Sequence, residues 1–342
     1  MKYENLNKKK QLYLGIEILR MFFAFIILFF HCRNKTIYNQ TFNKNLSELV
    51  DLGLTTFFII SFHFSYNSFI SKNINKIKER FKRFLIPYII WPIIIYLQKT
   101  LSNFINGKNN NILFKCLIYQ ILIGNGIYII LWFSFNLIFI SLLFINIIFI
   151  TKKYMAFLIF FGLMVILISS SNKYYKFWDG FNIIFYITYD IVSFSIRPIT
   201  NTYKLGLIGF FLSLLKIIEK HKTQKYLFLC IFIILLWLGI NNDYFKRILK
   251  NSFSIFLFLI FASIPFDKLK FNIFTLIKQI SRYTGGIYYI HLLIYSLLKQ
   301  YISFIISSGN IFMCIILYFL CYFICFIGSK LCKHNILKYL FI

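Results

Sequence analysis

The chain has 342 residues, 59% of them hydrophobic, with a mean hydropathy of +0.73 and a net charge of +28. Soluble domains are nearer 45–50% apolar, and the apolar runs here lack the alternation of barrel strands, so a soluble domain and a membrane β-barrel are both excluded. In a membrane protein, excess Lys and Arg marks cytoplasmic loops near anionic headgroups, so the charge does not indicate nucleic acid. We therefore predict an all-α, polytopic bundle of transmembrane helices.

The apolar runs predict about ten spans, which we expect to form a single integral membrane domain over residues 1–342. The expected spans are 13–32, 50–70, 84–99, 128–150, 154–170, one within 181–218, 226–240, 251–265, 284–307 and 311–331. Lys and Arg gather at the N-terminus and in the expected loops 71–83, 216–225 and 266–282, which share one side of a ten-span protein. The positive-inside rule therefore places both termini in the cytoplasm, against one basic stretch at 241–250.

The ends and loops of the chain are not expected to form a separate domain or site. The basic head lacks a small-residue cleavage pattern, so we expect an uncleaved first helix. No loop is long enough to fold as a separate catalytic domain. The seven cysteines contain no CxxC pair and lie mostly in or beside apolar runs, so we expect neither a disulfide framework nor a metal site. Any chemistry must then occur within the bundle or at its mouths.

The first span carries polar residues that a membrane helix does not ordinarily tolerate. A charge near mid-membrane costs roughly 2.5–3.5 kcal/mol on insertion scales, yet this span contains Glu17, Arg20 and His31. Arg20 and His31 are eleven residues apart, which is three helical turns plus roughly 20°, so they share a face. Glu17 precedes Arg20 by three residues and is expected to pair with it. We interpret this stripe as the wall of a polar central tunnel, with His31 near the outer end as a general base.

Two further clusters are expected at the two mouths of the bundle. Arg80 and Arg83 lie three residues apart at the cytoplasmic start of the third span, before Pro87, and the planar guanidinium suits phosphate. They are also compatible with ordinary positive-inside charges. Trp132 begins the fourth span on the outer side, where it suits either a sugar face or the aromatic belt.

Two more histidines, His63 and His291, lie inside expected spans. His291 is about eight residues into the span that starts at 284, at a depth expected to match that of Arg20. It is expected to face the bundle interior, either at a site or in a hydrogen bond between helices. His63, in the second span, has no expected role beyond such a hydrogen bond.

In their order and spacing these clusters resemble the acyltransferase family 3 of integral membrane proteins, which O-acylate bacterial surface polysaccharides. The resemblance is carried by four motifs and covers most of the chain: Glu17 with Arg20 and His31, the pair Arg80 and Arg83 before Pro87-Tyr88, Leu131-Trp132-Phe133, and Tyr288-Tyr289-Ile290-His291. Two positions depart from the family pattern. Phe62 follows Ser61 where a Gly is usual, which suggests altered packing, and Ser134 stands where a Leu is common.

The resemblance implies a multi-pass enzyme of the bacterial cell membrane with no permanently bound cofactor. Its co-substrate would be acetyl-coenzyme A or another acyl-coenzyme A, and its acceptor a hydroxyl of a surface polysaccharide or lipid-linked sugar. By similarity, His31 and Arg20 would be essential to acyl transfer, and Arg80 and Arg83 would hold the donor. From their positions in the spans we expect Glu17 to complete the catalytic group, His291 to contact the donor and Trp132 to bind the acceptor. No nucleic acid is expected as a partner.

Two other classes remain open from the sequence. A transporter or flippase of lipid-linked sugars also needs charges inside the membrane, but inverted repeats and paired broken helices are not evident. A polysaccharide polymerase is expected to carry a large outward loop, which this chain lacks.

Overall fold

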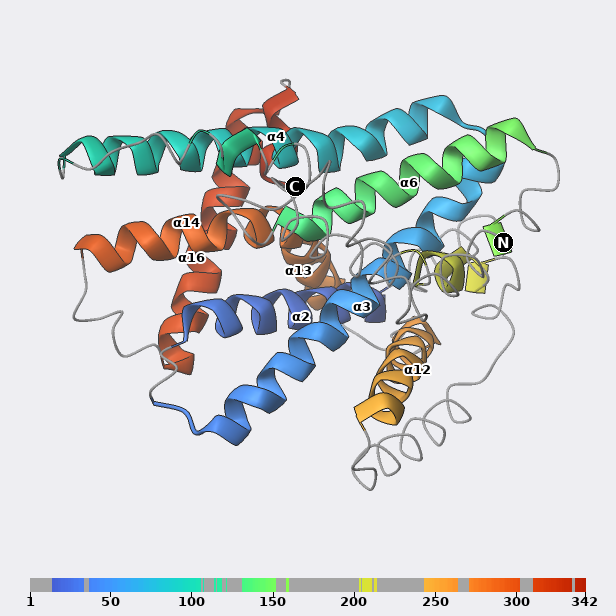
Figure 1. The fold of residues 1–342 in the computed structure, drawn as a ribbon, viewed down its shortest axis with the longest axis horizontal. Helices are drawn as coiled ribbons and strands as arrows, with labels where there is room; N and C mark the ends of the chain where they lie inside the picture. The colour runs from blue at the N-terminus through green and yellow to red at the C-terminus, as the bar shows by residue number, and fades with distance from the viewer. Residues whose placement is uncertain are drawn as a thin grey trace, which may run out of the picture. The chain divides into compact units, whose positions relative to one another are not determined.

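A computed structural model of the chain describes residues 14–33, 37–105, 131–151, 243–263, 271–301, 310–333 and 336–342, with short pieces at 107, 114, 116–118, 121, 158–159, 203, 205–210 and 212–213. These residues form α-helices, and no strand occurs among them. In chain order the helices are α2 (Leu14–Cys32), α3 (Gln40–Ile70), α4 (Ile74–Ile105), α6 (Trp132–Ile150), α12 (Asp243–Ser263), α13 (Phe271–Arg282), α14 (Thr284–Tyr301), α16 (Ile311–Leu331) and the short 3-10 helix η2 (Ile336–Leu340) (Figure 1).

Five of these helices are long and apolar enough to cross a membrane: α2, α3, α4, α6 and α16. They coincide with the expected spans 13–32, 50–70, 84–99, 128–150 and 311–331. The expected spans 251–265 and 284–307 fall on α12 and α14, which are helical but are not among the five. Spans 226–240, nearly all of 154–170 and most of 181–218 lie outside the described residues. The all-helical membrane architecture is therefore confirmed.

The expectation that residues 71–83 form a loop is wrong, because the chain from residue 74 onward is helix. The link between α3 and α4 is only residues 71–73, with Lys72 in the left-handed region at φ 51°. The Asn73 side-chain oxygen accepts from the Lys76 backbone N–H at 3.1 Å, which caps the start of α4. Lys, Arg, Glu and Ile are tolerated well in a helix, so the basic run continues the span as a helix rather than forming a loop.

Asparagine also caps two other described helices, α3 and α16. The Asn39 side-chain oxygen accepts from the Phe42 N–H at 2.7 Å before α3, and that of Asn310 accepts from the Met313 N–H at 2.9 Å before α16. Each satisfies a backbone donor that the helix itself leaves unpaired. The expected loop 266–282 is also partly helical, because α13 occupies its second half.

The chain divides into two compact units, of which the first contains residues 1–60 and 212–342. Within it α2 contacts α12, α13, α14 and α16, and Figure 1 shows α2, in blue, beside the orange and red helices from the other end of the chain. The α2 side chains Ile16, Phe23 and Leu28 are at most 1% exposed. The first span is therefore the centre of this unit.

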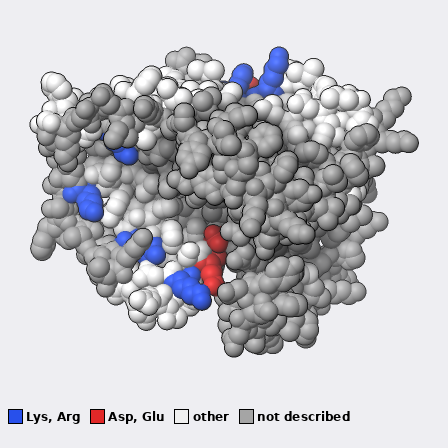
Figure 2. Space-filling view, in the orientation of Figure 1, with Lys and Arg blue, Asp and Glu red and all other residues white. Residues whose placement is uncertain are grey.

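Helix α16 has one face packed against the unit and an opposite apolar face that is exposed. One face buries Cys314, Cys321 and Cys325, small side chains that allow close helix contact. The opposite face leaves Phe312 and Phe323 65% and 55% exposed, a pattern that suits lipid rather than water. In the view of Figure 2 the described residues show few charged side chains, in small groups. We conclude that this is a membrane protein.

The second unit contains residues 61–211, including the end of α3, α4 and α6. Its core is aromatic: Phe62 is fully buried and lies 5.2 Å from Phe144 and 6.3 Å from Phe210 between ring centroids. Gly206 makes room for two of these rings, because a Cβ there would lie 3.1 Å from Phe144 and 3.3 Å from Phe62. The large ring at position 62 is thus accommodated by a glycine elsewhere in the unit.

Candidate active site

The candidate site is built in the first unit from the facing polar stripes of α2 and α14. On α2, Arg20 and His31 share a face because eleven residues make almost a whole number of turns. On α14, Thr284 and His291 share a face because seven residues are nearly two turns. Arg20 contacts Thr284, and His31 contacts His291, so the two stripes meet and the two helices run in the same direction.

At the lower end of the site, Arg20 is held by two partners at once. Its Nη1 donates to Glu17 Oε2 at 3.0 Å, and its Nη2 donates to Thr284 Oγ1 at 3.3 Å. The Thr284 hydroxyl in turn donates to the Ser281 carbonyl at 2.8 Å, which aims its lone pairs at the guanidinium. Thr284 is 3% exposed, whereas Glu17 and Arg20 keep about a third of their side chains accessible. The fork of Arg20 therefore ties α2 to the start of α14.

At the upper end, two imidazoles lie side by side. The ring centroids of His31 and His291 are 5.5 Å apart, with the rings tilted by 38°. The Nδ1 of His291 is 2.8 Å from the Tyr288 carbonyl and 3.2 Å from that of Ile287. A carbonyl oxygen only accepts, so Nδ1 carries the hydrogen and Nε2 keeps its lone pair. That Nε2 is buried and has no hydrogen-bond partner in the described part of the chain.

A close helix contact fixes the position of His291. A Cβ at Gly286 would lie 2.6 Å from the Phe341 carbonyl oxygen and 2.7 Å from Cys325 Sγ, so only glycine allows this approach. The first turn of α14 is thereby pressed against α16 and the C-terminal residues. His291 follows Gly286 by little more than one turn, so this contact fixes its position relative to α16 and the C-terminal residues.

The structure corrects one part of the sequence interpretation. His291 was expected at the depth of Arg20, but it lies beside His31, and Thr284 lies beside Arg20 instead. The expectation assumed that both spans enter the membrane at the same level. In fact α13 also packs against α2, so α14 begins further along it. The predicted Glu17–Arg20 pair and the inward orientation of His291, which is 1% exposed, are confirmed.

The predicted residues Arg80, Arg83 and Trp132 belong to the second unit. Arg80 is half-buried: its Nη2 donates to Ser61 Oγ at 2.6 Å, and its guanidinium lies over the Phe84 ring at 5.1 Å. Arg83 is exposed, and Trp132 is half-buried as the first residue of α6. The two arginines are therefore not equivalent, since Arg80 is part of the packing and Arg83 is accessible.

Sequence reasoning missed Thr284, the residue that joins the two polar stripes. A signal was available, because Thr284 precedes His291 by seven residues and so lies on its face. The described residues contain no cluster of three His, Cys, Asp or Glu side chains that could hold a metal, and their cysteines are free.

The model of the acyltransferase 3 family, described as an acyltransferase domain, matches residues 13–330. The chain belongs to the acyltransferase 3 family. The match spans both units and includes every residue of the candidate site. No curated protein and no solved structure gave a significant match. As a member of this family the protein is a membrane acyltransferase, which favours an enzyme over the transporter and polymerase alternatives.

Proposed function

We propose that this acyltransferase moves an acyl group, most simply acetyl, from cytoplasmic acyl-coenzyme A to a hydroxyl of a surface polysaccharide or lipid-linked sugar. The observation that carries the proposal is the imidazole pair of His31 and His291 beside the Arg20–Glu17 ion pair. An unperturbed imidazole titrates near neutral pH, so two imidazoles side by side inside a membrane protein, one half-buried and one buried, suit proton transfer. Intramembrane charges of this kind mark functional sites rather than stability.

In this proposal His31 is the general base. It takes the proton of the acceptor hydroxyl as the hydroxyl oxygen forms its bond to the acyl carbon. The thioester C–S bond then breaks, and the proton passes to the coenzyme A thiolate, so the products are an ester and free coenzyme A. His291 is proposed to assist His31. Its Nε2 has no partner in the described part of the chain, and we propose that its lone pair accepts an N–H of the neighbouring imidazole when the substrates are bound. Arg20 and Glu17 hold the two helices in the register that brings the imidazoles together.

The remaining residues are proposed to bind the two substrates. Arg83 is the exposed fork for the coenzyme A phosphates, with Arg80 beside it, and Trp132 is proposed to stack on the acceptor sugar. The complete bundle is proposed to have about ten spans around a polar tunnel, in the bacterial cell membrane, with both termini cytoplasmic. The parallel course of α2 and α14 supports this topology, because the first and ninth of ten spans run in the same direction.

Transfer of label tests the function directly. Membranes that contain the protein are expected to move the radiolabelled acetyl group of acetyl-coenzyme A into alkali-labile esters on added surface glycan, because oxygen esters hydrolyse in base. Membranes from cells without the gene give the background. Label that stays in acetyl-coenzyme A, with succinyl- and propionyl-coenzyme A equally inert, would contradict the proposal. A transporter or polymerase would consume none of these donors.

Replacing Arg83 by Ala is expected to raise the KM for acyl-coenzyme A about tenfold with kcat nearly unchanged, since one charge-assisted bond to phosphate is lost. The measurement is the initial rate over a range of donor concentrations. Lys82→Ala is the matched control, because Lys82 is a neighbouring exposed cation whose surface pair with Glu79, at 3.2 Å, contributes little. Equal shifts in both variants would mean that general surface charge, not a phosphate site, is being measured.

A further inference from the structure

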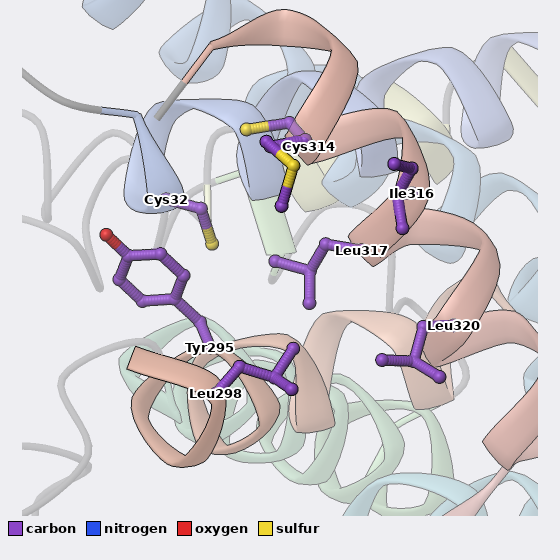
Figure 3. Close-up of a pocket in the computed structure, with 8 residues that line it drawn as sticks. Cys32, Tyr295, Leu298, Cys314, Ile316, Leu317 and Leu320 are labelled. Atoms are coloured by element: carbon purple, nitrogen blue, oxygen red, sulfur yellow. The ribbon is translucent and has the colours of Figure 1, made fainter. Parts of the chain in front are cut away.

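An apolar pocket in the first unit is lined by residues that follow the imidazole pair along α2 and α14. It has a volume of about 40 Å³ and lies between the end of α2, the middle of α14 and the start of α16. Figure 3 shows Cys32, Tyr295, Leu298 and Leu317 directed into the same space, and Met313, Cys314, Ile316 and Leu320 complete the lining. Neither the chemistry proposed above nor the family motifs use these residues.

The residues that line the pocket come just after the two histidines on α2 and α14. Cys32 directly follows His31 on α2. Tyr295 and Leu298 follow His291 by four and seven residues, so they continue its face of α14 roughly 6 and 10 Å further along the helix axis. Since α2 and α14 run parallel, the pocket lies beyond the imidazoles in the direction that leads away from Arg20.

This placement has a consequence for a thioester donor that approaches from the Arg20 end. The acyl group is the leading tip of acyl-coenzyme A, and its carbonyl carbon comes before the rest of the acyl chain. With the carbonyl at the imidazole pair, the remaining carbons must point onward, toward the pocket. We propose that this pocket receives the acyl chain of the donor and limits it to a short, uncharged group. The inference rests on the proposed function and adds the residues that set acyl specificity.

The size of the pocket supports a short chain. A water molecule needs roughly 10–15 Å³ counted in the same way, so 40 Å³ holds about three water-sized groups. The methyl of acetyl or the ethyl of propionyl fits this space, whereas a longer chain must extend past Ile316 and Leu320, lining residues that are 46% and 37% exposed. Cys32, Cys314 and Leu317 are 1%, 2% and 6% exposed, so three of the walls are packed on both sides and resist displacement.

The chemistry of the lining supports an uncharged chain. Its polar atoms are one phenol hydroxyl and two thiols, and none of its residues, all of them in the described part of the chain, carries a charge. A succinyl group would bring a carboxylate into this apolar space without a cation to pair with it. Burying such a charge unpaired is strongly unfavourable. Acetyl is therefore preferred over succinyl on electrostatic grounds and over butyryl on size.

The test compares acetyl-, propionyl-, butyryl- and succinyl-coenzyme A as donors for the wild type, Leu317→Ala and Leu298→Phe. One methylene in a hydrophobic pocket changes discrimination by about tenfold or more. Leu317→Ala is therefore expected to raise the ratio of butyryl to acetyl transfer about tenfold, and Leu298→Phe to lower the ratio of propionyl to acetyl. Leu331→Ala, at an 81% exposed position of the same helix, is expected to leave both ratios unchanged.

The outcomes separate this inference from the function on which it rests. If the variants transfer acetyl with the donor ratios of the wild type, the pocket does not hold the acyl chain, and an occupant such as a lipid tail is indicated instead. If the wild type uses none of the donors, the proposed function itself fails. If Leu317→Ala does not accumulate in membranes, Leu317→Val replaces it, because this change opens a smaller cavity. The ratio of butyryl to acetyl transfer by Leu317→Val is also expected to rise.

Discussion

Substitution of His31 by Gln is expected to lower acyl transfer by about 10²- to 10⁴-fold, the range attributed to a positioned general base. Gln keeps the size and hydrogen bonding of the side chain but cannot take a proton at neutral pH. His291 is not expected to replace the lost base, because its side chain is 1% exposed and its Nε2 is buried, which keeps an acceptor hydroxyl away from its lone pair. The measurement is the initial rate of label transfer, normalised to the amount of protein in the membrane.

His63→Gln is the matched control for this prediction. His63 is also buried within an apolar helix, at 9% exposure, but it belongs to the second unit and has no proposed part in the reaction. The same substitution there tests whether loss of any membrane histidine harms the fold. A comparable fall in both variants, or normal transfer by His31→Gln, would remove His31 from the proposed mechanism.

The parts of the site that the sequence predicted correctly are those that depend on one helix alone. Glu17 and Arg20 pair because residues three apart on a helix are neighbours, and the structure has them at 3.0 Å. Arg20 and His31 contact the same partner helix because eleven residues make three turns. The apolar runs likewise identify α2, α6 and α16 without knowledge of any neighbour.

What the sequence could not supply is how far one helix is shifted along another. The level of His291 depends on where α14 begins beside α2, and the contacts of Gly286 and of α13 determine that start. Those contacts join residues that are distant in the chain. They cannot be predicted by counting residues from the end of a span. The helical start of α4 was missed for a related reason, since hydropathy reports where lipid begins and not where a helix begins.

At Phe62, too, the sequence motif shows that packing is altered but not which distant residue makes room for the ring. The sequence indicates altered packing at this position, because a large ring stands where the family usually has a glycine. The accommodation comes from Gly206, 144 residues later, which leaves space for the Phe62 and Phe144 rings. A motif scan that treats each segment alone detects the departure without the residue that balances it.

Replacing Arg20 by Lys is expected to lower kcat by about 10- to 100-fold while the KM for the donor changes little. Lys keeps the positive charge but has a single nitrogen, whereas Arg20 uses two nitrogens to reach Glu17 and Thr284 together. Without that fork α14 is free to shift along α2, and the imidazoles lose their register. Arg20 acts in this account as a positioning residue, so its effect must pass through Thr284.

A double-mutant cycle with Thr284→Val tests that dependence. Val has the shape of Thr but no hydroxyl to accept from Arg20, so the single substitution is expected to lower kcat in the same direction as Arg20→Lys. Because both changes break one link, the combined variant should be little worse than Arg20→Lys alone, which means that the two effects are strongly non-additive. Fully additive losses would show that Arg20 acts elsewhere, for instance directly on the substrate, and the positioning account would then be wrong.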